Sequence, residues 1–261
     1  MKAKTNGIEL NYELHGDRGP WVVLSHSLAC DLRMWNAQIR LLEERFRVLA
    51  FDTRGHGKSG APSGAYSLDQ LVEDARGLLE CVGADQPHWV GLSMGGMIGM
   101  TFALKYPGAL RSLVLCDTTS RMPTQMAPVW ADRIKTASEK GMSALVAPTL
   151  ERWFTEPFRT SRKDVTDRVA AMIAGTNADG YAGCCHAIPK INCTDELHAI
   201  SCPVQIIVGE QDAGTPVAMS QEIQRAIPHA ELVVIPRASH LSNLEQPEKF
   251  NAALDRFLSV H

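Results

Sequence analysis

Short apolar runs alternate with amphipathic segments along most of the chain. The runs are continuous and rich in Val, Leu and Ile, which is typical of strands in a sheet that is covered on both faces. The first of them are Trp21–Ser25, Arg47–Phe51, His88–Gly91 and Ser112–Cys116. Residues 31–46 and 67–81 place apolar side chains at helical spacing, with Ser67 as an N-cap and Gly83 as a stop. This alternation predicts an α/β fold with a mostly parallel, doubly wound sheet.

The N-terminal segment has a different pattern. Residues 7–14 alternate apolar and polar side chains, and turn-forming residues follow at positions 15–20. The spacing predicts a hairpin in which residues 7–14 pair with Trp21–Ser25.

The alternation of strands and helices stops after Cys116. Residues 118–195 contain only helical stretches, with no apolar strand between them. These stretches are Pro128–Ser138, Met142–Phe154, Lys163–Gly175 and Gly180–Ile188. Strand patterns return at Val204–Val208 and Glu231–Ile235, each followed by a helix. We therefore expect a core of residues 1–117 and 196–261, and a helical cap of residues 118–195 inserted after the sixth strand.

The composition excludes several classes of function. The 261 residues include 26 Lys and Arg against 29 Asp and Glu, a net charge of −3, so no basic surplus favours nucleic acid. The chain has no run of about 18 uncharged apolar residues and no apolar leader, which predicts no membrane partner and a cytoplasmic location. The seven cysteines have neither disulfide-framework nor metal-site spacing, so we expect reduced thiols and no metal.

A candidate nucleophile lies between the third apolar run and the helix that follows it. The pattern Gly91-x-Ser93-x-Gly95 is a nucleophile elbow, in which a sharp turn lifts the serine hydroxyl out of the sheet. Glycines are needed there because a Cβ would collide with the neighbouring backbone. The expected helix runs from Met97 to Tyr106. The alternative is a glycine-rich turn with an inert serine.

Two further residues complete a possible catalytic triad. Asp212 follows the strand Val204–Val208, and His240 follows the strand Glu231–Ile235, so both should lie at the same sheet edge as Ser93. The imidazole would take the proton of the serine, and the carboxylate would hold the imidazole in the required tautomer. Glu210 follows the same strand as Asp212 and is an alternative acid. His26 and His56 lie on early loops and are expected to shape the site rather than react.

The oxyanion formed during acyl transfer needs two backbone N–H donors. One is expected from Met94, the residue after the nucleophile, and the other from Leu28 in the loop after the first buried strand. Both assignments rest on loop position, because a backbone donor does not constrain the side chain.

Six segments of the chain together resemble the 3-oxoadipate enol-lactonases, a family of α/β-hydrolases of bacterial protocatechuate degradation. The resemblance covers residues 8–258 and rests on His26–Ala29, Asp52–Ser59, Gly91–Met97, Glu151–Thr155, Gly180–Ile188 and Ala238–Pro247. The second and third segments are shared by many capped α/β-hydrolases, whereas the cap segments and the ending around His240 are more specific. Ala29-Cys30 departs from the Gly-Thr that these enzymes often carry.

The resemblance implies an activity without cofactor or metal. Ser93 would open the ring of a small lactone, and a water activated by His240 would release 3-oxoadipate. The substrate carries a carboxylate, which an apolar cap binds poorly without a cation. The candidate cap arginines are Arg121, Arg133, Arg152, Arg159 and Arg162. Arg133 is the favoured substrate contact, with Trp130 and Trp153 as aromatic neighbours that either cover the ring or pack inside the cap.

Two other interpretations remain open. The same triad would suit a general carboxylesterase or a cofactor-free perhydrolase. Some proteins of this fold are ligand receptors with a slow or inert triad, and fold alone does not separate these functions. No oligomeric state is predicted.

Overall fold

The computed structural model describes residues 1–261, which form one mixed sheet with helices on both faces. The eight strands lie in the order β1-β2-β4-β3-β5-β6-β7-β8. Their bounds are β1 Lys2–Thr5, β2 Ile8–His15, β3 Trp21–Ser25, β4 Arg47–Phe51, β5 His88–Leu92, β6 Ser112–Cys116, β7 Val204–Gly209 and β8 Glu231–Ile235. Strands β3 to β8 pair in parallel, and β1 and β2 form an antiparallel edge. The predicted α/β class is confirmed.

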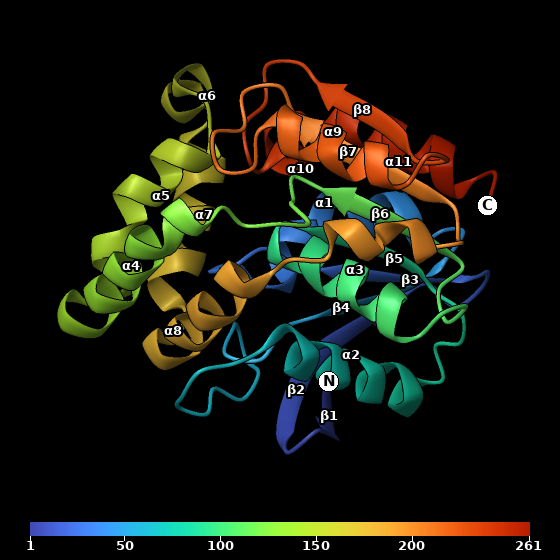
Figure 1. Ribbon diagram of the computed structural model, residues 1–261, viewed down its shortest axis with the longest axis horizontal. Helices are drawn as coiled ribbons and strands as arrows, with labels where there is room; N and C mark the ends of the chain where they lie inside the picture. The colour runs from blue at the N-terminus through green and yellow to red at the C-terminus, as the bar shows by residue number, and fades with distance from the viewer.

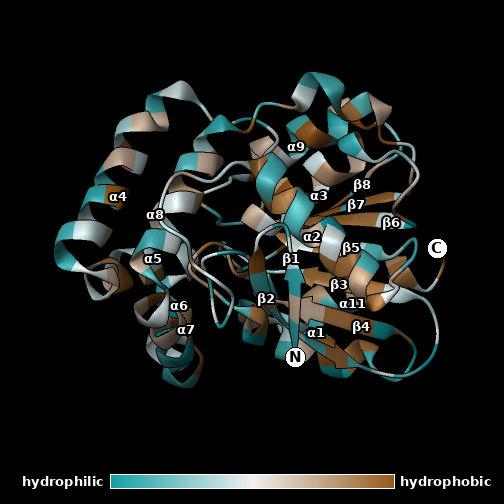
Figure 2. Ribbon diagram, turned by 90° about the horizontal axis from the view of Figure 1, so that it is seen from below, coloured by the Kyte–Doolittle hydropathy of each residue, from teal (hydrophilic) through white to brown (hydrophobic).

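Helices cover both faces of the sheet (Figures 1 and 2). Their bounds are α1 Asn36–Leu42, α2 Leu68–Val82, α3 Met94–Lys105, α4 Ala127–Lys140, α5 Val146–Trp153, α6 Glu156–Ser161, α7 Lys163–Gly175, α8 Ala178–Ala187, α9 Val217–Ala226, α10 Ser242–Glu245 and α11 Pro247–Leu258. Short 3₁₀ helices are η1 Leu32–Trp35, η2 Thr124–Met126, η3 Met142–Leu145, η4 Ile188–Lys190 and η5 Thr194–Ala199. Helices α2 and α3 pack together on one face with α9, and α1 packs with α11 on the other.

The centre of the core is β5, which is buried along its whole length because helices cover both of its faces. Trp89 of this strand stacks on Phe102 of α3 at a ring distance of 5.6 Å, and its indole N–H donates to the Gly95 carbonyl at 3.0 Å. The strand before Ser93 and the helix after it are therefore joined by packing and by a hydrogen bond. Burial of the two rings stabilises this junction by several kcal/mol, at about 25 cal/mol per Å² of apolar surface.

The predicted hairpin between residues 7–14 and Trp21–Ser25 is wrong. Strand β2 pairs with β1 and β4, and β3 lies on the far side of β4. The connection at 16–20 passes over the end of the α1 segment, where Gly16 and Gly19 approach the carbonyls of residues 43–46 too closely for any Cβ. The chain thereby crosses β4 before it enters the sheet, and the apolar β3 obtains two parallel neighbours.

Most predicted helices are confirmed, and their ends follow local chemistry. The Ser67 side chain accepts the N–H of Gln70 at 3.1 Å, and Gly83 ends α2 with φ 68°. Helix α3 begins at Met94, three residues before the predicted start, so it follows Ser93 directly. The sequence pattern missed β1, α6 and α10, which are short. Arg54 makes a buried ion pair with Asp74 at 2.6 Å.

Helices α4 to α8 fill the chain between β6 and β7 and contain no strand of the sheet. Figure 1 shows them gathered beside the carboxyl ends of the parallel strands. The two ends of this segment lie side by side, since Arg121 and Asn192 form an isolated bridge and the Cys193 N–H donates to the Ser120 carbonyl at 2.9 Å. We propose residues 118–195 as the boundaries of the cap. No helix in the structure has the length and apolar character that crossing a membrane requires.

Candidate active site

Ser93 lies between the last residue of β5 and the first residue of α3, with φ 55° and ψ −112°. A positive φ is strained for a residue with a Cβ, and the surrounding structure holds it. The Ser93 N–H donates to the Cys116 carbonyl at 2.8 Å, and its own carbonyl accepts the Thr118 hydroxyl at 2.7 Å. A Cβ on Gly91 would collide with the carbonyl of Gly95, so the turn requires glycine there. The geometry is that of an elbow which presents a hydroxyl.

Asp212 and His240 are in contact at the same edge of the sheet. Nδ1 of His240 donates to Oδ2 of Asp212 at 2.8 Å, and both residues are buried. The Thr215 hydroxyl donates to Oδ2 at 2.7 Å, and the N–H groups of Gly214 and Thr215 donate to Oδ1 at 2.8 and 3.0 Å. Burial disfavours the carboxylate, but His240 and these donors outweigh burial and lower the pKa of Asp212. The carboxylate is therefore ionised and fixed, as an orienting acid requires.

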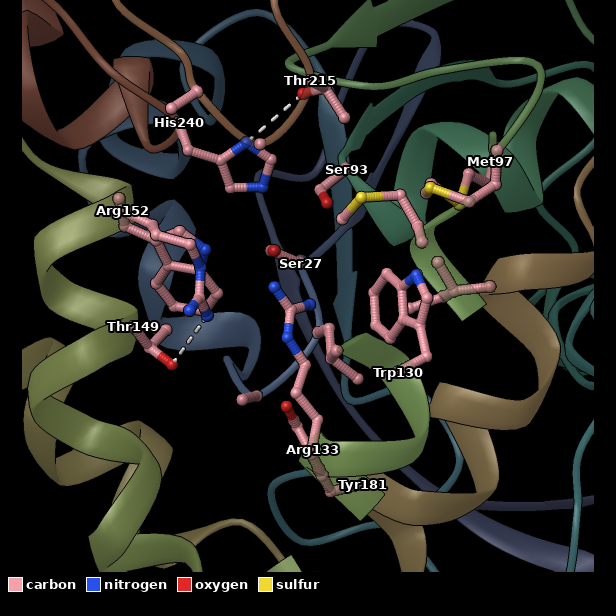
Figure 3. Close-up of a pocket in the computed structure, with 18 residues that line it drawn as sticks. Ser27, Ser93, Met97, Trp130, Arg133, Thr149, Arg152, Tyr181, Thr215 and His240 are labelled. Carbon is pink, nitrogen blue, oxygen red and sulfur yellow. Dashed lines mark hydrogen bonds between the residues drawn. The ribbon is translucent and has the colours of Figure 1, made fainter. Parts of the chain in front are cut away.

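The second nitrogen of His240 is turned toward Ser93 (Figure 3). Both side chains line one cavity, although no hydrogen bond joins them in this structure. In unliganded enzymes such bonds are often long and tighten only when substrate binds. The ring of Trp153 stacks on the imidazole at 6.0 Å with an interplanar angle of 29°. The structure therefore gathers Ser93, Asp212 and His240 at one place, from three different loops.

The alternative acid Glu210 has other contacts. Its carboxylate accepts the Arg237 N–H at 3.1 Å in an exposed position. Of the two acids after β7, Asp212 is the one that His240 contacts.

The two residues proposed as oxyanion donors lie beside Ser93, one in the sequence and one across the cavity lining. Met94 is the first residue of α3, where backbone N–H groups have no partner within the helix. The Leu28 N–H makes no hydrogen bond, whereas the next N–H, that of Ala29, donates to Nε2 of His56 at 2.9 Å. Leu28 lines the cavity beside Ser93, and the Met94 side chain is buried in the core.

His26 and His56 form hydrogen bonds with the loops around this site, and these bonds fix the tautomer of each ring. Nε2 of His26 accepts the Thr53 N–H at 2.9 Å, so its Nδ1 carries the proton and donates to the Ser27 carbonyl at 2.7 Å. Nδ1 of His56 donates to the Arg54 carbonyl at 3.1 Å. Burial lowers the pKa of both rings, to about 3 for His56. Both rings are neutral, and their hydrogen bonds to backbone groups stabilise these loops.

Because both rings are buried and neutral, we expect the protein to lose stability in mild acid. Between pH 6.5 and 3 the unfolded chain protonates His56 and the folded chain does not, so the free energy of unfolding falls as the pH falls. The expected slope is about 1.4 kcal/mol per pH unit for each such histidine. Urea unfolding at pH 7, 6 and 5 should show it. In His56→Gln the slope should decrease by about 1.4 kcal/mol per pH unit, the contribution of one proton. An unchanged slope would contradict a neutral His56.

A cavity of about 120 Å³ opens in front of Ser93, between the sheet edge and the cap. Its apolar lining includes Leu28, Met97, Met122, Met126 and Ile188. Its polar lining includes groups from the cap, among them Thr149 and Tyr181. Trp130 and Trp153 both line the cavity while being largely buried. The methionines and Tyr181 were missed by sequence reasoning, because nothing in the sequence shows which face of a cap helix meets the site.

Two arginines reach into this cavity from α4 and α5 (Figure 3). The Arg133 guanidinium lies 4.5 Å from the ring centre of Trp130, and its buried Nε has no hydrogen-bond partner. Arg152 donates to the Thr149 hydroxyl at 3.2 Å. Burial, and then the charge of Arg133, lower the pKa of Arg152. Neither arginine has a carboxylate partner, so the cavity presents two positive charges with unused donors.

The other cap arginines have partners elsewhere. Arg121 pairs with Asp195 at 2.9 Å and Arg162 with Asp164 at 2.9 Å, both on the surface. Arg159 donates to the carbonyls of Glu151 and Phe154 at 2.9 and 3.0 Å. Arg133 is thus in the cavity as the sequence suggested, and Arg152 joins it.

A third acid lies behind the site. Asp117 is fully buried at the end of β6, accepts the Gly209 N–H at 2.7 Å and shares a 2.5 Å hydrogen bond with Ser242. Burial, and then the charge of Asp212, raise the pKa of Asp117 well above its usual value. Its contacts join the end of β6 to the loops that carry Asp212 and His240. No group of His, Cys, Asp and Glu side chains in the chain is arranged to hold a metal ion.

This fold, with a serine at a strained strand-to-helix turn, is that of the α/β-hydrolases. A family model described as alpha/beta hydrolase fold matches residues 20–247, and the chain belongs to this family of hydrolytic enzymes. Its similarity to the enol-lactonases is confirmed by a 3-oxoadipate enol-lactonase 2 of Acinetobacter baylyi, 35% identical over 95% of this chain and 92% of that protein.

Solved structures agree with this placement. The crystal structure of an enol-lactonase from Burkholderia xenovorans superposes with a TM-score of 0.96 at 36% identity, covering 99% of this chain and 100% of that one. A thermophilic esterase from Thermogutta terrifontis, solved with malate bound, gives a TM-score of 0.94 at 31% identity over 99% and 98% of the two chains. The family therefore includes both lactonases and esterases.

Proposed function

We propose that the protein hydrolyses 3-oxoadipate enol-lactone, a small lactone that bears a carboxylate, in bacterial protocatechuate degradation. The observation that carries this proposal is the cavity itself, which holds Ser93 and His240 beside two arginines without acidic partners. A hydrolase of neutral esters has no need of two partly buried positive charges without acidic partners, which are costly unless a ligand neutralises them. The similarity to enol-lactonases supports the same substrate.

In the proposed reaction, Ser93 attacks the lactone carbonyl as His240 takes the hydroxyl proton. Asp212 keeps Nδ1 protonated, so that Nε2 is free to act as the base. The N–H groups of Leu28 and Met94 bind the oxyanion of the tetrahedral intermediate. Its collapse breaks the ring C–O bond, and the enolate that leaves receives the proton from His240 and becomes a ketone.

The second half of the reaction releases the acid. A water loses its proton to His240 and attacks the acyl carbon, and the bond to Ser93 breaks as the serine regains a proton. The product is a dicarboxylate, 3-oxoadipate. Throughout both steps the original carboxylate would remain on Arg133 and Arg152, which holds the carbonyl in front of Ser93. Trp130 and Trp153 would cover the ring of the substrate.

The direct test is a progress curve on freshly generated enol-lactone. We expect many turnovers per enzyme and a kcat/KM at least about 100-fold above that on a neutral aryl ester, because one substrate carboxylate meets two arginines. A preference for the neutral ester would instead favour a general carboxylesterase, which the methionines that line the cavity would suit. A peroxide and halide assay tests the perhydrolase alternative, and lack of any turnover would favour a ligand receptor.

Removing the arginines should change substrate preference rather than catalysis. In Arg133→Met and Arg152→Met, kcat/KM for the lactone should fall about 10- to 100-fold each, since a hydrogen bond to a charged group contributes about 1.5–3 kcal/mol. Hydrolysis of a neutral aryl ester should stay within about threefold. Arg121→Met, which removes a paired surface arginine of the cap, is the matched control. Equal losses on both substrates would show that the arginines support the fold and not the carboxylate.

A further inference from the structure

The loop that carries His240 is hydrogen-bonded directly to the cap. The Ser239 hydroxyl donates to the Arg152 carbonyl at 3.0 Å, and the Leu241 N–H donates to the Trp153 carbonyl at 3.2 Å. The residues on both sides of the histidine thus contact the backbone of two residues whose side chains line the cavity. Trp153 also stacks on the imidazole. The last turn of α5 and the histidine loop consequently form one contact surface.

The side chain of Glu245 forms hydrogen bonds on both sides of this contact surface. One oxygen of its carboxylate, Oε1, accepts both the N–H of Thr155 at 3.0 Å and the Thr155 hydroxyl at 2.5 Å. The other, Oε2, accepts the Ser239 N–H at 2.9 Å. The residue is only 4% exposed, although it is an acid on the short helix α10. It therefore connects the cap, through Thr155, to the residue next to His240.

The three groups that bond Glu245 are all donors, so both terminal atoms of its side chain must be acceptors to bridge Thr155 and Ser239. A carboxylate supplies two acceptor oxygens, whereas an amide would turn an NH₂ group toward one of the donors. A buried donor that loses its partner costs more than the bond itself contributes. Burial raises the pKa of this carboxyl, and the bonds from Thr155 and Ser239 act against that rise. The nearby Arg159 favours the carboxylate as well.

We infer that Glu245 is a positioning residue, which holds His240 and cap residues 152–155 as one unit. The imidazole would then keep a fixed place relative to Arg152 and Trp153, so that a substrate held by the cap has its carbonyl within reach of the base. Errors of about 1 Å in such alignment can lower a rate by about 100-fold. This inference rests on the proposed ester or lactone hydrolysis, but it concerns a residue outside the triad and the cavity lining.

The test compares Glu245→Gln and Glu245→Ala with the wild type in the full chain. We expect kcat to fall about tenfold or more while KM for the lactone stays within about twofold, because the arginines that bind the carboxylate remain in place. Glu248→Gln, at an exposed acid three residues further on, is the matched control and should retain wild-type kcat. A variant with normal kcat and only a lower melting temperature would overturn the inference and leave a purely structural role.

Thr155→Val tests the bridge from the cap side with a smaller change. It removes one hydroxyl, keeps the side-chain shape and leaves the Ser239 bond intact, so it should fold even if Glu245→Ala does not. The expected loss in kcat is about threefold, at the scale of one hydrogen bond. In the double variant with Glu245→Gln the two losses should not multiply, since both residues act through the same bridge. Independent losses would contradict the inference.

Failure of the proposed function remains distinguishable from failure of this inference. The wild type alone decides whether the enol-lactone is a substrate. The Glu245 series depends only on the ratio of variant to wild type, and any aryl ester that the wild type turns over can be used for it. Lactone turnover with an unaffected Glu245 series would reject the positioning role alone.

Discussion

Ser93→Ala is expected to lower kcat by at least about 10⁴-fold on any ester or lactone that the wild type accepts. The remaining site would still bind and polarise the carbonyl, but it would contain no group to form the acyl-enzyme, and triad serines elsewhere show losses of this size. Single-turnover and steady-state assays at several enzyme concentrations would measure it.

The Ser93→Ala variant should fold as the wild type does. Alanine has the same Cβ and therefore the same strain at φ 55°, and the backbone bonds to Cys116 and Thr118 are kept. Its melting temperature should therefore stay within about 2 °C of the wild type, which corresponds to about 1 kcal/mol or less in a chain of this length. Residual turnover above about 1% would show that another group is the nucleophile.

Asp212→Asn is expected to lower kcat by about 10⁴-fold with little change in KM. Asp212 accepts from His240, from the Thr215 hydroxyl and from two backbone N–H groups, and an amide cannot accept from all of them. The amide NH₂ would face Nδ1 and favour the tautomer with a proton on Nε2. That tautomer cannot take the proton of Ser93.

Glu210→Gln serves as the control for Asp212→Asn. The Glu210 side chain makes one hydrogen bond, from the Arg237 backbone N–H, and none to His240. The variant should therefore keep kcat within about twofold of the wild type. If Glu210→Gln lost activity and Asp212→Asn did not, the acid of the triad would have to be reassigned. The pH dependence of kcat/KM, measured on both variants, would show which of the two acids acts on the catalytic base.

The sheet was predictable because its strands are apolar on both faces. The runs at 21–25, 47–51 and 112–116 are each strands within the same bounds in the structure. Strand β1 was not predictable, since the edge sequence Lys2–Thr5 has only one apolar residue and depends on β2 for its pairing. The hairpin error has a related cause. Local alternation indicates a strand but not its neighbour, and here the close approach of Gly16 and Gly19 to residues 43–46 decides the pairing.

The positions of the proposed triad were predictable to a greater extent than those of the residues around them. Ser93, Asp212 and His240 each follow a recognisable strand, and the ends of parallel strands meet at one edge. Asp117 follows a recognisable strand as well, but neither it nor Glu245 was singled out, because only burial and contacts in the fold distinguish them from ordinary polar residues. Arg152 could not be separated from the other candidate cap arginines by sequence, since its role depends on which side of α5 faces the cavity.

The paired ends of the inserted helices have a consequence for how such an enzyme can diversify. Because the chain leaves the sheet near Ser120 and returns near Cys193 through neighbouring backbone, the segment between them can lengthen, shorten or be exchanged without displacing the elbow. New substrates are then accessible through exchange of one contiguous block. A donor block must still supply a hydroxyl residue at the place of Thr155, or the recipient's Glu245 keeps only the backbone N–H of that position as its partner across the join.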